Sequence, residues 1–409
     1  MIRPFAALRP TPEFAAQVAA PPYDVLSTEE ARAAARGKPW SFLHISKPEI
    51  DLPEGTEPYS PQVYAKASEN LRHMLDSGVL KRDARPYYYV YRMVMNGHAQ
   101  TGLAAACSIA DYDAQRVRRH ELKRPDKEDD RVRQIEAVNA HTGPVLLAHP
   151  AAPQVDAMLT DASSGTPDFD VTAANGVRHV LWVIRDEDRI SRLTAAFDAM
   201  PALYIADGHH RTAAASRVAA ARRAAAPRGS RAASYDNFLS VAFPHHQLRI
   251  LPYNRIVRDL NGLERGEFLR RVEARFSVTP SAGRVTPERR GVFGLYLPGQ
   301  WYRLEIDPAR IPADPTARLD ISLLAEHLLG PVLAIGDPRT DPRIDFVGGI
   351  RGPEELERRV AGGTAAAFSM YPTSLQDLMV VADAGRIMPP KSTWFEPKLA
   401  DGLVSLVLD

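Results

Sequence analysis

Apolar and polar positions follow a helical period in one part of the first hundred residues and a strand period in another. Residues 61–80 have apolar side chains three or four positions apart, which is typical of an amphipathic helix, and Gly78 is placed to end it. Segments rich in Tyr and Val flank Asn96-Gly97, a dipeptide that favours the tight turn of a β-hairpin. The short run FLHIS, residues 42–46, lies between prolines and predicts a strand. The apolar face of the helix comprises Val63, Ala67, Leu71, Met74 and Leu75.

Helical and strand patterns alternate through the middle of the chain. Helices are expected at about residues 127–140 and at 209–224, the second directly after the strand ALYIAD. Further strands are expected at PVLLAH, at RHVLWVIRD and twice within DNFLSVAFPHHQLRILPYNRIV, and ISRLTAAFDAM predicts a helix. Interleaving of this kind predicts a mixed α/β chain of the α+β class.

The pattern changes again near residue 255. A helix, a hairpin and a helix follow, and then a strand, a helix, a proline-rich loop and a last strand. We therefore expect two domains. Residues 1–254 form a core with an inserted hairpin and a charged loop, and residues 255–409 form an α+β subdomain that contributes the MPPKST loop.

Charge and composition narrow the classes of function. The 409 residues have a net charge of +1, so no overall field attracts nucleic acid or an anionic membrane. The single cysteine, Cys107, excludes an internal disulfide framework and a cysteine-rich zinc site. No segment has the apolar run of a signal peptide or a membrane span. A cytoplasmic location is therefore expected, without a nucleic-acid or membrane partner.

The stretch YIADGHHRTAAASR, residues 204–217, carries the strongest chemical signal. The first turn of a helix has N–H groups without helical partners and a partial positive charge, so it favours an anion such as phosphate. Gly208 lets such a ligand approach the backbone, and Arg211 can hold phosphate oxygens through two N–H groups. We expect Gly208, His210 and Arg211 to hold phosphate here, and His209 is a catalytic candidate beside them.

Asp207 is the unusual member of the stretch, because an acid repels phosphate. It fits as a ligand of Mg²⁺ that bridges the phosphates, or as the acceptor of a proton from a substrate hydroxyl. The alternative is that Asp207 caps the helix and the histidines only pack. A zinc site is not favoured, since neighbouring histidines on a helix point about 100° apart.

Two resemblances rest on these residues. IADGHHRTAAA resembles the phosphate-binding motif of the ParB/sulfiredoxin superfamily, and its DGHHR form is similar to that of the free-serine kinases, which phosphorylate serine with a nucleotide. This implies a ParB/sulfiredoxin-like core with a large insertion. Nearly the whole chain resembles the family known as domain of unknown function 1015, through motifs in the same order: PPYDVLS, RHELKRPDKEDDR, YIADGHHRTAAA, LDISLLAEHLLG, FVGG and ADAGRIMPPKSTWFEPKLADGL.

The loop PPYDVLS contains two candidate substrate-binding residues, Tyr23 and Asp24. Two prolines stiffen the backbone ahead of them, as a rigid binding loop requires. The superfamily resemblance implies that such a loop faces the glycine–arginine turn across a nucleotide pocket. The alternative is an ordinary turn capped by the acid.

The segment RHELKRPDKEDDR, residues 119–131, is interpreted either as a solvated loop or as part of an active site. In the second reading His120 or Glu121 is a general base for a hydroxyl, Lys127 and Arg131 hold phosphate, and Asp130 holds a metal ion. The family resemblance favours function for His120 and Glu121.

The loop MPPKSTWFEPKL is the third charged site. Lys391, Ser392 and Thr393 offer an ammonium and two hydroxyls to phosphate, although the glycine run of a P-loop is missing. The alternative is a packed loop anchored by its aromatic residues. Arg255 is a further candidate for binding the substrate as an anion clamp.

Together these sites predict a phosphoryl-transfer enzyme that acts on a small hydroxylated metabolite such as serine. The phosphate would lie on the Asp207–Arg211 turn, Mg²⁺ would be the metal, and a nucleotide or pyrophosphate would be the phosphate donor. The first alternative is a phosphate-ester hydrolase that resembles a phosphoserine phosphatase. The second is a non-catalytic nucleotide-binding switch of the ParB type. The expected partner is a small phosphorylated molecule. The sequence leaves the oligomeric state open, and a homodimer is one possibility.

Overall fold

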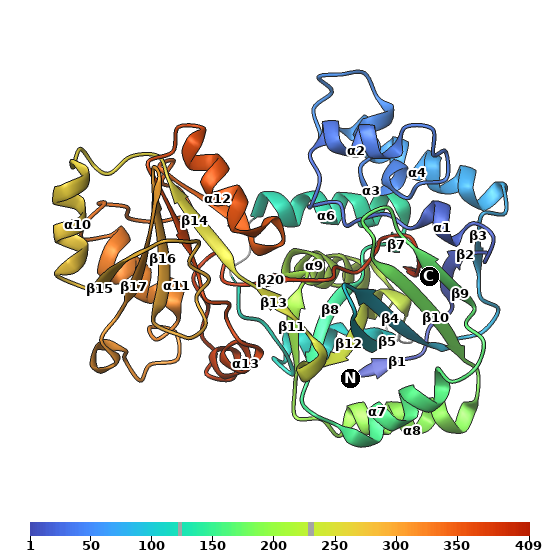
Figure 1. Ribbon diagram of the computed structural model, residues 1–409. Coiled ribbons are helices and arrows are strands. Elements are labelled where there is room, and N and C mark those ends of the chain that lie inside the picture. Colours follow the sequence, from blue (N-terminus) through green and yellow to red (C-terminus); the bar gives the residue numbers. More distant parts are fainter. Residues whose placement is uncertain (122–124, 228–232) are drawn as a thin grey trace. The chain divides into compact units, whose positions relative to one another are not determined.

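The computed structural model describes residues 1–121, 125–227 and 233–409, which divide into two compact units. The first unit comprises residues 1–119, 125–227, 233–248 and 397–409. The second comprises residues 120–121 and 249–396. The last segment of the chain therefore belongs to the first unit. Figure 1 labels the helices and strands of both.

A nine-stranded sheet organises the first unit, in the order β6-β11-β8-β12-β5-β4-β10-β9, with β1 paired to β5. The expected hairpin is confirmed, since β4 and β5 pair antiparallel and Asn96 and Gly97 both have positive φ. The strand ALYIAD is β11, which pairs with β8 and β6. The strands are β1 Ile2–Arg3, β4 Tyr88–Met95, β5 His98–Ser108, β6 Val117–Arg118, β8 Val145–His149, β9 Phe169–Thr172, β10 Arg178–Ile184, β11 Leu203–Asp207 and β12 Asn237–Pro244.

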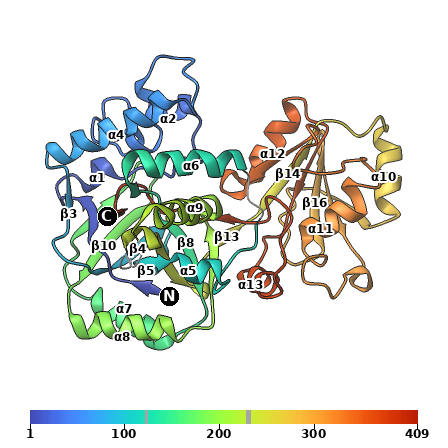
Figure 2. The same ribbon diagram turned by 180° about the vertical axis from the view of Figure 1, so that it is seen from behind.

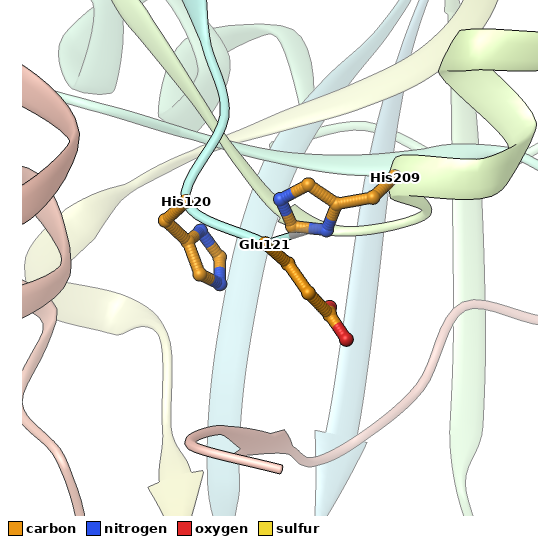
Figure 3. A group of neighbouring side chains, drawn as sticks. All are labelled: His120, Glu121 and His209. Atoms are coloured by element: carbon orange, nitrogen blue, oxygen red, sulfur yellow. The ribbon is translucent and has the colours of Figure 1, made fainter. Parts of the chain in front are cut away.

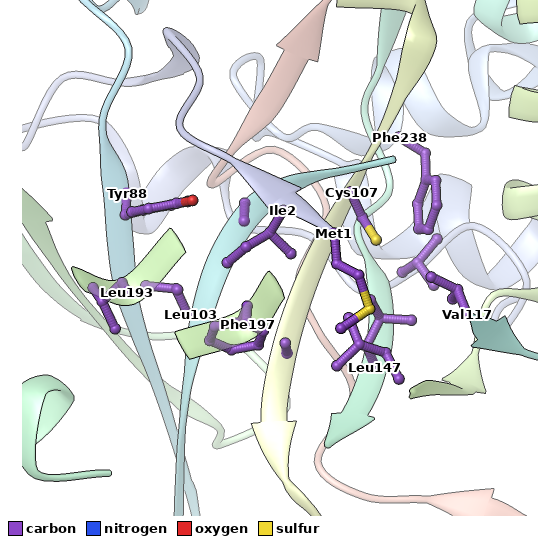
Figure 4. Packing of buried hydrophobic residues seen from close by; sticks show 14 of the residues in the cluster. Met1, Ile2, Tyr88, Leu103, Cys107, Val117, Leu147, Leu193, Phe197 and Phe238 are labelled. Atoms are coloured by element: carbon purple, nitrogen blue, oxygen red, sulfur yellow. The ribbon is translucent and has the colours of Figure 1, made fainter. Parts of the chain in front are cut away.

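Helices cover this sheet. The helices α7 and α8 lie side by side against it, and α6 lies alongside α9 in both views (Figures 1 and 2). Apolar side chains from β1, β4, β5 and α8 fill the space between α8 and the sheet, with the Cys107 thiol buried among them (Figure 4). The helices of this unit are α1 Ala15–Val18, α2 Thr28–Ala35, α3 Leu43–Ser46, α4 Pro61–Asp76, α5 Ile109–Asp113, α6 Pro125–Val138, α7 Pro153–Ala162, α8 Glu187–Asp198 and α9 His209–Ala225, with 3-10 turns at Pro48–Asp51, Ser234–Asp236 and His245–Gln247.

A second, four-stranded sheet attaches the C-terminal segment to the first unit. Its order is β3-β2-β21-β7, so the last strand of the chain lies between an N-terminal strand and β7. A further bridge joins Ala20 to Asp401. This sheet brings residues 397–409 to the loop that contains Tyr23 and Asp24. Its strands are β2 Ala7–Pro10, β3 Leu80–Arg82, β7 Ala140–His141 and β21 Ser405–Val407.

The structure corrects two details of the sequence analysis. FLHIS forms the helical turn α3 rather than a strand, because side chains satisfy its carbonyls: Asn70 donates to His44 O at 2.7 Å and Gln134 to Ile45 O at 2.9 Å. A short apolar run does not distinguish the two states, and the packing against α4 decides. Leu75 is 40% exposed, so it does not join the buried face of α4.

The second unit is built on a six-stranded sheet in the order β15-β17-β16-β19-β14-β18, and a separate pair joins β13 to β20. The helix α12 packs against β19, β16, β14 and β18, over a small apolar core. Its strands are β13 Ile250–Leu251, β14 Tyr253–Val257, β15 Ser277–Ser281, β16 Val292–Leu297, β17 Gln300–Glu305, β18 Ile344–Gly348, β19 Ala366–Ser369 and β20 Trp394–Phe395. Its helices are α10 Arg265–Glu273, α11 Asp320–Leu324 with a π-type turn Ala325–Leu329, α12 Gly352–Ala361 and α13 Leu375–Asp383, and 3-10 turns lie at Pro308–Arg310 and Gly349–Arg351.

Helices thus alternate along the chain with strands that form several sheets, as the pattern predicted. Within the described residues, no helix combines the length and the apolar character needed to cross a membrane.

Candidate functional site

The strand–glycine–helix turn predicted from the sequence is present. β11 ends at Asp207, Gly208 has a φ of +106°, and α9 begins at His209. Only glycine adopts such a φ without strain. Gly208 also makes room, since a Cβ on it would lie 3.1 Å from Arg211 Nε. No side chain caps the helix, so the alternative in which Asp207 is the cap is not what the structure shows.

Arg211 folds back over this turn and is buried. Its Nη2 donates to Asp207 Oδ2 at 3.1 Å, and its Nη1 donates to the carbonyl of Pro144. Gly143 leaves space for the side chain, because a Cβ there would lie 3.3 Å from Arg211 Cδ. The arginine therefore ties the helix start to the loop ahead of β8, and it presents a positive charge directly at the glycine turn.

Asp207 is held as an anion. Burial raises its pKa, but the charges of Lys398, Arg211 and His209 lower it well below the usual range. Two of these groups form ion pairs with Asp207 Oδ2: Arg211 Nη2 lies 3.1 Å from it and Lys398 Nζ 3.6 Å from it. A carboxylate with so low a pKa is a poor proton acceptor at neutral pH. Two cations, Arg211 and Lys398, thus surround the Asp207 carboxylate at the glycine turn.

A second group of predicted residues surrounds Tyr23. The Arg131 guanidinium lies 3.8 Å from the centre of the Tyr23 ring, and its Nη2 is 2.7 Å from Asp130 Oδ2. The other oxygen of Asp130 accepts from Tyr64 at 2.9 Å. Both carboxylate oxygens of Asp130 therefore already accept hydrogen bonds, which disfavours Asp130 as a metal ligand. Burial raises the pKa of Tyr23, whereas Arg131 lowers it. Asp24 is exposed.

Two residues of this site were not found by sequence reasoning. Lys398 lies beside Asp207, and Asp401 is buried next to Arg211 and Gly143. Burial raises the pKa of Asp401 to about 7; Arg211 and Arg131 lower it and Asp24 raises it. The only local signal was the pattern EPKLADG after the proline-rich loop, which does not reveal a position near the glycine turn.

Figure 3 shows His120 and Glu121, neighbours in the chain, and His209 at the first position of α9. His120 and Glu121 belong to the second unit, where Met388 N donates to His120 O at 2.8 Å, and His209 belongs to the first. The sequence assigned catalytic roles to all three.

The second unit brings the predicted Lys391–Thr393 loop and Arg255 together. Arg255 is buried; it donates to Lys391 O at 3.0 Å and to the carbonyl of Tyr253. Burial lowers the pKa of Arg255 to about 10. Thr373 donates to Ser392 O at 2.9 Å, and Ser392 Oγ donates to Pro389 O. These backbone contacts give Arg255 a role in shaping the loop.

Two predicted residues, Lys127 and His210, remain. Lys127 donates to the hydroxyl of Tyr59, an exposed side chain, at 2.7 Å. His210 is half-buried in the first turn of α9. Their assignment to phosphate stays a prediction.

A strand–glycine–helix turn with a buried arginine thus lies in a chain of mixed helices and strands. The chain matches the family described as "Protein of unknown function (DUF1015)" over residues 2–322. It belongs to that family, as the order of its motifs predicted.

Solved structures of limited similarity extend the comparison. A free serine kinase in complex with AMP is 12% identical, with a TM-score of 0.37, over 75% of this chain and 91% of that chain. SbnI with a C-terminal truncation, from Staphylococcus aureus, is 11% identical, with a TM-score of 0.39, over 74% and 87%. A conserved hypothetical protein from Pyrococcus furiosus is 13% identical, with a TM-score of 0.35, over 74% and 94%. No curated protein matched. Likenesses at these TM-scores transfer no role to residues of this chain.

Proposed function

We propose that the protein is a phosphoryl-transfer enzyme that acts on a small hydroxylated metabolite such as serine. The observation that supports it is the arrangement at the start of α9: a glycine turn with a buried arginine, Arg211, and an ionised Asp207 beside it. The N–H groups of the first helical turn and the nearby cations suit phosphate. The DGHHR sequence, similar to that of the free-serine kinases, supports serine as the first substrate to test.

In this proposal Gly208, His210 and Arg211 hold the phosphate of a nucleotide or of pyrophosphate, and Lys391 in the second unit adds positive charge. The substrate hydroxyl oxygen forms a bond to phosphorus while the bond to the leaving phosphate oxygen breaks. Because Asp207 is ionised at neutral pH, we assign the hydroxyl proton to Glu121 or His120.

Magnesium would enter with the phosphate donor. Asp207 is the carboxylate best placed to contact it, although Arg211 and Lys398 compete for the same charge. Asp130 is left out of this proposal, since Tyr64 and Arg131 occupy both of its oxygens.

We also propose that the core of the first unit is ParB/sulfiredoxin-like, on the strength of its glycine–arginine turn. An experimental structure with bound nucleotide tests this, since the phosphates would lie on the first turn of α9. A ParB-type switch would bind nucleotide without turnover, and a hydrolase would release phosphate from phosphoserine alone.

Phosphorus-31 NMR of the purified protein with Mg²⁺ distinguishes these activities. One set of tubes contains serine with ATP, ADP or pyrophosphate, and another contains phosphoserine alone. The kinase proposal expects a phosphoserine signal that Asp207→Asn and Arg211→Lys both reduce at least about a hundredfold, the usual loss for one contact to a charged transition state. The matched control is Arg217→Lys, on the same helix but in an exposed ion pair with Asp129. Silence in every tube contradicts the proposal.

The roles of His120 and Glu121 have a separate test. Glu121→Gln and His120→Ala are expected to lower turnover at least about a hundredfold, as the loss of a general base does, while nucleotide affinity changes little. Unchanged turnover in both variants removes His120 and Glu121 from the chemistry.

A further inference from the structure

The C-terminal segment carries an acid, Asp401, that the proposed reaction has not used. Its side chain is 2% exposed. Its backbone pairs with Ala20 in both directions, from Asp401 N to Ala20 O at 2.9 Å and from Ala20 N to Asp401 O at 3.2 Å. Ala20 leads directly into the loop with Tyr23 and Asp24, so Asp401 is fixed to that loop.

The Asp401 side chain points to the same small space as Arg211. A Cβ built on Gly143 would lie 3.2 Å from Asp401 Oδ1 and 3.6 Å from Arg211 Nη1. The backbone of Tyr23 gives the carboxyl group one hydrogen bond. Its Oδ1 is buried and has no hydrogen-bond partner among the described residues. A buried oxygen left in this way costs free energy, and the cost is larger for the charged form.

Charged and titratable groups from four elements face this carboxyl group. They are Tyr23 and Asp24 from the loop after α1, Tyr91 from β4, Arg131 from α6 and Arg211 from α9. Burial raises the pKa of Asp401 to about 7, against the lowering by the two arginines. The acid therefore changes its charge in the pH range in which the protein would work.

We propose that Asp401 is a positioning residue of the phosphate site, which holds the Tyr23 loop against Arg211 and takes up a proton when phosphate binds at the start of α9. This rests on the proposed function, because the ligand is the same phosphate group. An incoming phosphate shares Arg211 with Asp401, and two anions on one cation repel each other. Protonation of Asp401 removes that repulsion. By linkage, phosphate affinity then falls as the pH rises.

The test is calorimetric titration of ADP into the full chain between pH 5.5 and 8.5, with wild type beside Asp401→Asn. The phosphates of ADP change their protonation with pH in the same way in both experiments. The ratio of the two Kd values therefore reports only the effect of the Asp401 carboxyl group. The ratio is expected to stay within about twofold at pH 5.5 and to reach about tenfold at pH 8.5, with wild type the weaker, since one pK unit corresponds to a factor of ten. Asp188→Asn, an exposed acid on α8, is the matched control and is expected to follow wild type.

A ratio that does not change with pH overturns the proposal, even if Asp401→Asn alters the thermal stability. Should that variant not fold, proton uptake by wild type on binding inorganic sulfate decides the question. Sulfate itself does not titrate in this range, so a fractional uptake that is largest near neutrality supports the proposal and zero uptake overturns it. If wild type does not bind ADP at any pH, the proposed function itself fails; if it binds ADP but the ratio of Kd values does not change with pH, only the role of Asp401 fails.

Discussion

Lys398 Nζ lies 3.6 Å from Asp207 Oδ2, so a residue of the C-terminal segment contacts the acid of the glycine turn. The same oxygen accepts from Arg211 Nη2 at 3.1 Å. One carboxylate oxygen thus serves two cations, and this explains why the pKa of Asp207 is held low despite burial, which raises it. Asp207 organises positive charge around the helix start.

Lys398→Met is therefore expected to weaken binding of ADP about 5- to 30-fold, since one charged contact is worth about 1–2 kcal/mol. The pKa of Asp207 is expected to rise towards its ordinary range in the same variant. Calorimetric titration at pH 7 measures the affinity. Lys66→Met is the control, because Lys66 also loses one carboxylate partner, Glu69 at 2.9 Å, on the surface of α4. Equal affinities in both variants contradict the prediction.

Gly208→Ala tests the turn itself. The φ of +106° costs a residue with a Cβ about 1–2 kcal/mol, and the Cβ would press on Arg211 Nε at 3.1 Å. Gly176→Ala separates the two effects, since Gly176 has a φ of +79° and open space around it. Urea unfolding of both variants is the measurement. A loss in Gly208→Ala no larger than in Gly176→Ala would show that Arg211 moves aside freely.

The parts of the site that sequence reasoning found are local in the chain. The turn from β11 through Gly208 to α9 follows from residues in sequence order, because a strand, a glycine and a helix start need no distant partner. The Tyr23–Arg131 contact was not predicted as a pair, but both residues were candidates for the same pocket.

Lys398 and Asp401 could not be found in this way. They reach the site because β21 inserts between β2 and β7, and a strand pairing between distant segments leaves no periodic signal. FLHIS failed for a related reason, since Asn70 and Gln134, far along the chain, stabilise its helical turn. The glycine turn and its charged residues could thus be predicted from the sequence, whereas the pairing between distant segments could not.

The stack of Arg131 on Tyr23 is expected to depend on the ring and not on the hydroxyl. Tyr23→Phe should keep the stability of wild type within about 0.5 kcal/mol, and Tyr23→Leu should lose about 1–2 kcal/mol, the value of a desolvated cation–π contact. Urea unfolding measures both. If Tyr23→Phe is as damaging as Tyr23→Leu, the hydroxyl has a role of its own, such as contact with a ligand.

Arg255→Lys is expected to loosen the Lys391–Thr393 loop. Lysine keeps the charge but lacks the planar fork that reaches both Tyr253 O and Lys391 O, so the second unit loses about 1–3 kcal/mol. Hydrogen exchange over residues 389–393 is expected to accelerate. Arg358→Lys is the control: the Arg358 side chain is exposed and pairs with Glu355 within α12, so this change is expected to leave exchange in that loop unchanged.

The raised pKa of Asp401 also predicts how stability without ligand depends on pH. Its folded pKa of about 7 exceeds the ordinary value of about 3.9, so the folded state binds more protons than the unfolded state between these values. This contribution to stability is complete below about pH 4 and is lost as the pH rises through about 7. Replacing Asp401 by a neutral residue of the same shape removes this loss of folding stability at high pH.

Asp401→Asn is therefore expected to gain stability relative to wild type as the pH rises from 5 to 8. Between pH 5 and 8 about two pK units of the shift take effect, so the upper limit of this gain is about 3 kcal/mol. The observed gain is expected to be smaller, because the asparagine amide also needs hydrogen-bond partners. Urea unfolding at pH 5, 6, 7 and 8 gives the difference directly. A constant difference would mean that Asp401 stays ionised in the folded protein, held by Arg211 and Arg131, and the proton uptake proposed for phosphate binding would then have no source.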